Sequence, residues 1–103
     1  MEEQNLTLDL NQKQLNESWL LMFGTIIQDI LSAMQGGTTM NVNVKGSQPQ
    51  VQSFIKSLAG EKNYIEAAKK YGLTDPKTFQ DKAKAEVAAK NFTRQTGIPF
   101  PFK

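Results

Sequence analysis

Alternation of apolar and polar residues predicts two short strands. In segment 1–10, Leu6, Leu8 and Leu10 alternate with polar side chains, which is typical of a strand with one buried face. Segment 38–45 repeats this period of two, with apolar side chains at positions 40, 42 and 44. Two strands alone form a marginal sheet in water. Pairing within one chain and pairing between copies are both open from the sequence.

In segment 11–36, between the two strands, apolar residues recur with the period of a helix. Asn11 is a suitable N-cap and Gln14 its capping-box partner, so we expect a long amphipathic helix from about Gln12 to Gln35, stopped by Gly36. Its apolar side chains span an arc of about 180° on the helical wheel, with Leu21 as an exception. This arc is formed by Trp19, Leu20, Met22, Phe23, Ile26, Ile27, Ile30, Leu31, Ala33 and Met34.

Segment 47–95 is predicted to be helical and to contain two to three helices. Ser47 and Gln50 form a capping box at its start, and Gly60 is expected to break or kink the first helix. Gly72 is a C-terminal stop, and Asp75 followed by a proline starts the last helix. Two prolines then predict an extended apolar tail over 96–103. The fold class is therefore mainly α (α+β), in a single domain over 1–103.

The chemistry available to the chain is limited, because it contains no cysteine and no histidine. Serine or cysteine hydrolases that need a histidine are excluded, as are the usual zinc sites. We expect no enzyme, no metal and no cofactor. The acidic start lacks the apolar run of a secretory signal, which predicts a cytoplasmic location. Gln28 and Asp29 interrupt the longest apolar stretch, so we expect no membrane attachment.

Charge is divided unevenly between the two halves of the chain. Residues 1–44 carry one basic and five acidic side chains, whereas residues 45–103 carry eleven basic and five acidic ones. The basic half is a candidate for phosphate contacts, although it contains only one arginine. Lys77 and Lys84 belong to this half, and the candidate contact residues are Lys62, Lys69, Lys70, Lys82, Lys90 and Arg94. A nucleic-acid-binding accessory protein is therefore the alternative function.

The preferred function is that of a non-enzymatic structural or assembly protein that acts as a homo-oligomer. The apolar arc is wider than one neighbouring helix covers, and the aromatic tail must dock on its own domain or on a neighbour. Burial of this surface between copies would drive assembly. The candidate interface residues are Trp19, Phe23, Ile26, Ile30, Phe100 and Phe102.

Three stretches resemble small uncharacterised proteins encoded by tailed phages of marine bacteria. They are Trp19-Leu20-Leu21-Met22-Phe23-Gly24, Tyr71-Gly72-Leu73-Thr74-Asp75-Pro76 and Thr96-Gly97-Ile98-Pro99-Phe100-Pro101-Phe102, together less than a quarter of the chain. The resemblance implies no activity and no site residues. It favours an assembly component, which would place the protein in the virion if it is phage-encoded.

Overall fold

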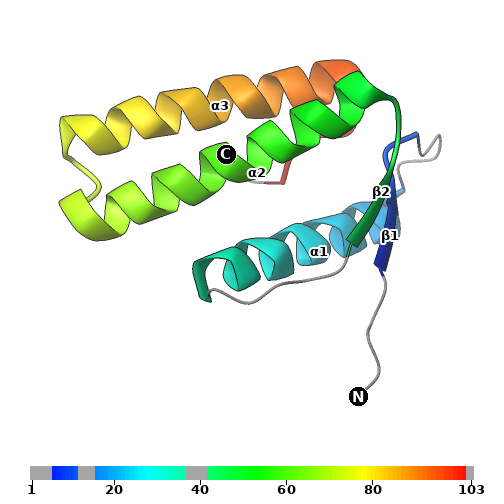
Figure 1. The fold of residues 1–103 in the computed structure, drawn as a ribbon, viewed down its shortest axis with the longest axis horizontal. Helices are drawn as coiled ribbons and strands as arrows, with labels where there is room; N and C mark the ends of the chain where they lie inside the picture. The colour runs from blue at the N-terminus through cyan, green and yellow to red at the C-terminus, as the bar shows by residue number, and fades with distance from the viewer. Residues whose placement is uncertain (1–5, 12–15, 37–41, 102–103) are drawn as a thin grey trace.

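The protein is mainly helical, with one small sheet (Figure 1). The computed structural model describes residues 6–11, 16–36 and 42–101. The elements follow in the order β1 (Leu6–Asp9), α1 (Glu17–Gly36), β2 (Val42–Lys45), α2 (Gln48–Tyr71) and α3 (Pro76–Thr96). The mainly helical class predicted from the sequence is confirmed. Segment 47–95 contains two helices, and α2 and α3 form a long antiparallel hairpin beside the β1–α1–β2 unit (Figure 1).

The two strands pair with each other within the chain, and they run parallel. Leu8 lies opposite Val44, and Asp9 lies opposite Lys45. Parallel neighbours need a crossover connection, and α1 supplies it. Leu8 is buried on the core side of the sheet, whereas Thr7 is exposed on the other side, as the period of two requires.

The start of α1 differs from the prediction. The expected cap, Asn11, lies in a turn after β1, where its backbone N–H donates to Asp9 Oδ1 at 2.9 Å. Asn16 caps the helix instead, because its Oδ1 accepts from the Trp19 N–H at 2.8 Å. Both asparagines suit an N-cap. The predicted partner, Gln14, lies outside the described residues.

The predicted break at Gly60 is wrong, because α2 continues through it to Tyr71. A Cβ atom at position 60 would lie 3.1 Å from Ala85 Cα, so this glycine permits the close approach of α3. The predicted start of α2 is confirmed: Ser47 Oγ accepts from the Gln50 N–H, and Gln50 Oε1 accepts from the Ser47 N–H at 2.8 Å.

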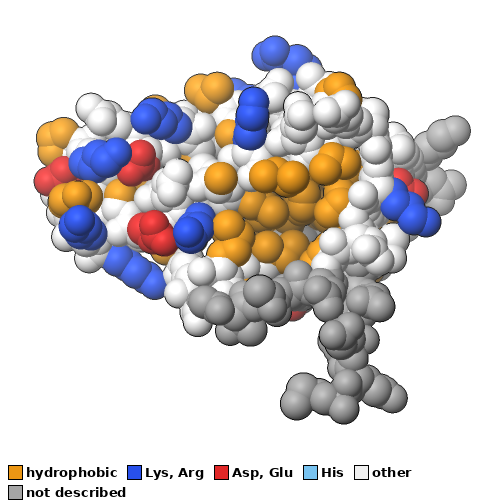
Figure 2. All heavy atoms as spheres, in the orientation of Figure 1, with side chains coloured by type: hydrophobic (Ala, Val, Ile, Leu, Met, Phe, Trp, Pro, Cys, Tyr) orange, Lys and Arg blue, Asp and Glu red, His pale blue; other side chains and the backbone are white. Residues whose placement is uncertain are grey.

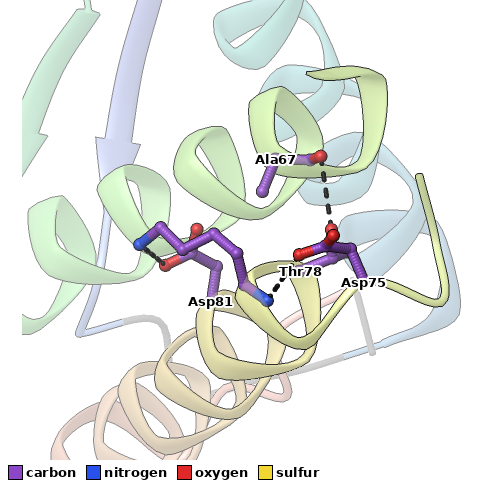
Figure 3. A network of polar contacts seen from close by, with 5 residues as sticks. Ala67, Asp75, Thr78 and Asp81 are labelled. Carbon is purple, nitrogen blue, oxygen red and sulfur yellow. Dashed lines mark hydrogen bonds and ion pairs between the residues drawn. The ribbon is translucent and has the colours of Figure 1, made fainter. Parts of the chain in front are cut away.

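The residues predicted to form the turn between α2 and α3 do connect the two helices. Gly72 adopts a positive φ of 90° at the end of α2, and Asp75 caps α3 by accepting from the Lys77 N–H at 2.9 Å. The Thr78 hydroxyl lies 2.6 Å from the Gly72 carbonyl oxygen. It also lies 3.2 Å from the Ala67 carbonyl oxygen, as Figure 3 shows. These contacts hold the first turn of α3 against the last turns of α2.

Four contacts, including that of Thr78 with Ala67, set one register along the hairpin. In order from its open end, they are Gln50 Nε2 to the Gln95 carbonyl at 3.4 Å, Ser57 Oγ to the Ala88 carbonyl at 3.0 Å, Gly60 against Ala85, and Thr78 Oγ1 to the Ala67 carbonyl. Gly60 has no side chain, and the backbones of α2 and α3 lie close together at its contact with Ala85.

The core is organised around the ring of Phe92, which is fully buried. Its centroid lies 6.0 Å from that of Phe23 in α1, 5.8 Å from that of Phe54 in α2, and 5.6 Å from that of Phe100 after α3. The chain leaves α3 at Gly97, which has a left-handed φ of 78°. Ile98 and Phe100 then fold back into the core.

Candidate docking groove between α2 and α3

A groove with an apolar floor and a cationic rim lies along the hairpin. Lys56 of α2 lines one side, and residues of α3 form the rest. The α3 residues are Ala83, Lys84, Val87, Ala88, Lys90, Asn91 and Arg94. They follow the spacing of one helix face. The rim therefore carries four cations, and its lining contains no carboxylate.

The groove opens away from α1. Phe54 and Leu58 are buried on the side of α2 that faces the core shared with α1. Lys56 lies two residues after Phe54, which places it roughly 200° around the helix axis. The groove is therefore exposed to solvent on the far side of the hairpin, and Val87 in its floor is 68% exposed.

The groove cations are not neutralised by ion pairs among the described residues. The two ion pairs found there join Lys62 to Glu66 at 3.6 Å and Lys77 to Asp81 at 3.4 Å, and neither involves the groove. Four positive charges around an apolar surface whose lining holds no carboxylate attract an anionic ligand or partner.

The structure brings together only part of the predicted phosphate-contact set. Lys90 and Arg94 line the groove, whereas the other candidates do not. Lys69 donates to Gln35 Oε1 at 2.8 Å at the end of α1, and Lys70 lies 5.2 Å from the Tyr71 ring centroid. Lys62 is paired with Glu66, and Lys82 is exposed.

Lys56 is the one groove cation that the sequence does not identify. It lies more than thirty residues before Lys90, on another helix. Only the antiparallel register of α2 and α3 brings the two side chains to one groove. The sequence signal for that register is the set of small residues at Ser57, Gly60 and Ala85, where the helices approach most closely.

A second hollow lies nearer the closed end of the hairpin and has mixed charge. Two acids, Glu66 and Asp81, line it, so its cations have carboxylates nearby. The other lining residues are Asn63, Ala67, Lys70, Tyr71, Lys77 and Lys84. Its net attraction for an anion is therefore weaker than that of the groove.

Glu61 is a buried acid outside both hollows. Its residue surface is 5% exposed, and burial, helped by the negative charge of Glu86, raises the pKa of its carboxyl above the ordinary 4.5. A raised pKa in a cleft marks candidate acid–base chemistry. Glu61 lines neither hollow, so we assign its effect to stability.

The predicted interface residues contribute mostly to the core of the single chain. Phe23, Ile26 and Phe100 are buried there, and Trp19 is half-buried with its ring stacked 5.3 Å from that of Phe23. Ile30 is also half-buried, and Phe102 lies outside the described residues. The wide apolar arc of α1 is therefore largely covered within one chain.

Other apolar side chains remain on the surface. Figure 2 shows an orange patch where α1, α2 and β2 meet. Partly buried apolar residues of these elements are Ile30, Met34, Val42, Val44 and Val51. On the outer side of α1, Leu21 is 69% exposed and Met22 is 47% exposed. Exposed apolar surface of this extent is available for contacts with another protein.

Within the ranges that the structure describes, no helix has the length and apolar character needed to span a membrane. Comparison of the chain with protein-family models, with curated proteins and with solved structures gives no match.

Proposed function

We propose that the protein is a non-enzymatic assembly protein that acts as a homo-oligomer, and that the groove between α2 and α3 is its docking site. One observation carries the proposal: the groove joins an exposed apolar floor to four cations and contains no carboxylate. Such a surface is complementary to a protein segment with both acidic and apolar side chains. The resemblance to phage-encoded proteins agrees with an assembly role.

Nucleic-acid binding is the second candidate, because phosphates would also be attracted to this rim. Lys90 and Arg94 supply two of the charges, and Lys56 and Lys84 supply the others. Single-stranded nucleic acids, however, are commonly held by stacking on aromatic side chains. The groove lining contains no aromatic residue and one arginine, which favours a protein partner.

The test of self-association is the mass in solution, measured by light scattering after size exclusion. We expect a mass above that of one chain for the wild type, and a lower mass for Lys90→Glu. Lys82→Glu is the matched control: it makes the same charge change on an exposed α3 residue outside the groove. A single-chain mass for the wild type at every concentration and salt level would contradict the proposal.

The same variants distinguish nucleic-acid binding. Labelled single- and double-stranded oligonucleotides are titrated with each protein, and binding is followed by fluorescence anisotropy. If the wild type stays monomeric yet binds oligonucleotides with a steep salt dependence, and Lys90→Glu alone loses that binding, the second candidate replaces the first.

A further inference from the structure

The outer face of α1 has the chemistry that the groove lacks. Glu17, Leu21, Met22 and Asp29 are all exposed on this face. The sequence from Glu17 to Gly36 contains these two acids and no basic residue. This face therefore presents negative charge beside apolar side chains, whereas the groove presents positive charge around an apolar floor.

The axial spacing of charges is also similar on the two helices. Glu17 and Asp29 are twelve residues apart, which is about 18 Å along a helix, and Lys84 and Arg94 are ten residues apart, or about 15 Å. Leu21 follows Glu17 by one helical turn, as Val87 follows Lys84 by about one turn. The order acid, apolar, acid thus meets the order cation, apolar, cation when the two helices run parallel.

The α1 helix of the same chain does not fill the groove. Its buried face, which includes Phe23 and Ile27, contributes to the core shared with Phe54 and Leu58 of α2. The exposed face of α1 consequently points away from the hairpin, and the groove opens on the side of the hairpin remote from α1. The two complementary surfaces therefore lie on opposite sides of one molecule.

We infer that the groove of one copy binds the outer face of α1 from a second copy, head to tail. This inference rests on the proposed assembly function and identifies the two surfaces that meet. Such an interface is heterologous: each added copy leaves one groove and one α1 face free. The product is a ring if the rotation between copies closes, and an open chain if it does not. Because charged rim contacts contribute, salt weakens the association.

A paired charge-reversal experiment tests the inference. One variant carries Lys84→Glu and Arg94→Glu, so that the two groove positions that would face Glu17 and Asp29 become acidic, like those two residues. The other carries Glu17→Lys and Asp29→Lys, so that both surfaces are basic. We expect each variant alone to have the mass of one chain, and an equimolar mixture to recover a larger mass. Lys82→Glu, outside both surfaces, should retain the wild-type mass.

Several outcomes separate this inference from the assembly function itself. If the wild type is an oligomer and both double variants keep its mass, assembly stands and the proposed interface is overturned. The interface is also overturned if only the groove variant dissociates, or if the mixture fails to recover mass while circular dichroism shows both variants folded. If the wild type is monomeric, the assembly function itself fails. Leu21→Ser, at a side chain that is 69% exposed, provides a fold-preserving check and should weaken association.

Discussion

Two glycines in helix interiors provide a matched test of the packing between α2 and α3. Gly24 lies within α1 and Gly60 within α2. Replacing a glycine by alanine in a helix interior stabilises the helix by about 1 kcal/mol. At position 24 the new Cβ would lie 3.7 Å from Pro101 Cβ, which is an ordinary contact. We therefore expect Gly24→Ala to raise the free energy of unfolding by about 1 kcal/mol.

At position 60 the same methyl group would lie 3.1 Å from the Cα atom of Ala85. A backbone atom cannot move aside as a side-chain tip can, so the two helices must separate. Overpacking of this kind costs about 1–3 kcal/mol. Subtracting the propensity gain of about 1 kcal/mol leaves Gly60→Ala between neutral and about 2 kcal/mol destabilising.

Urea denaturation followed by far-UV circular dichroism measures both variants against the wild type. The chain of 103 residues should have a total stability of about 5–15 kcal/mol, so the expected difference between the variants is measurable. Equal stabilisation by Gly24→Ala and Gly60→Ala would refute the close approach of α2 and α3 at Ala85.

Three further substitutions test the core, the buried acid and a helix cap. Phe92→Ala removes the ring that contacts three others, and we expect a loss of about 3–5 kcal/mol in urea denaturation; a loss below about 1 kcal/mol would contradict the central role of this ring. Because burial raises the pKa of Glu61, its contribution to stability is full below pH 4.5 and falls as pH rises through the raised value. Glu61→Gln should remove this loss of stability with rising pH. If the melting temperatures of wild type and variant change with pH by the same amount, the prediction is wrong. Ser47→Ala should cost about 1 kcal/mol in thermal melts by removing the acceptor of the Gln50 N–H, and an unchanged midpoint would argue against the cap.

Local signals in the sequence account for most of the element boundaries. Ser47 and Gln50 start α2, and Asp75 starts α3, because each side chain satisfies helix N–H groups that have no partner within the helix. Alternating side chains identify both strands, because a half-buried strand exposes every second residue. These features depend on residues only a few positions apart.

The error at Asn11 comes from a local contact, and the error at Gly60 concerns a residue that packs against a distant one. Asn11 and Asn16 are chemically identical caps, and the turn after β1 places the helix start at the second. Gly60 was expected to break or kink a helix on propensity alone, but α2 continues through it to Tyr71 and packs closely against Ala85 there. A propensity near 1 kcal/mol is readily outweighed by tertiary contacts.

For the candidate groove too, some features follow from the sequence and others only from the tertiary structure. The sequence by itself determined that the second half is basic and that α3 would carry Lys90 and Arg94 about one turn apart. Only the tertiary structure decided that Lys56 joins them, since the register of the hairpin aligns residues from two helices. Tertiary packing likewise decided that Phe23 and Phe100 are buried within one chain, because both rings belong to the core around Phe92. Local chemistry specifies the helices and strands, and contacts between distant residues specify which of their faces remain free.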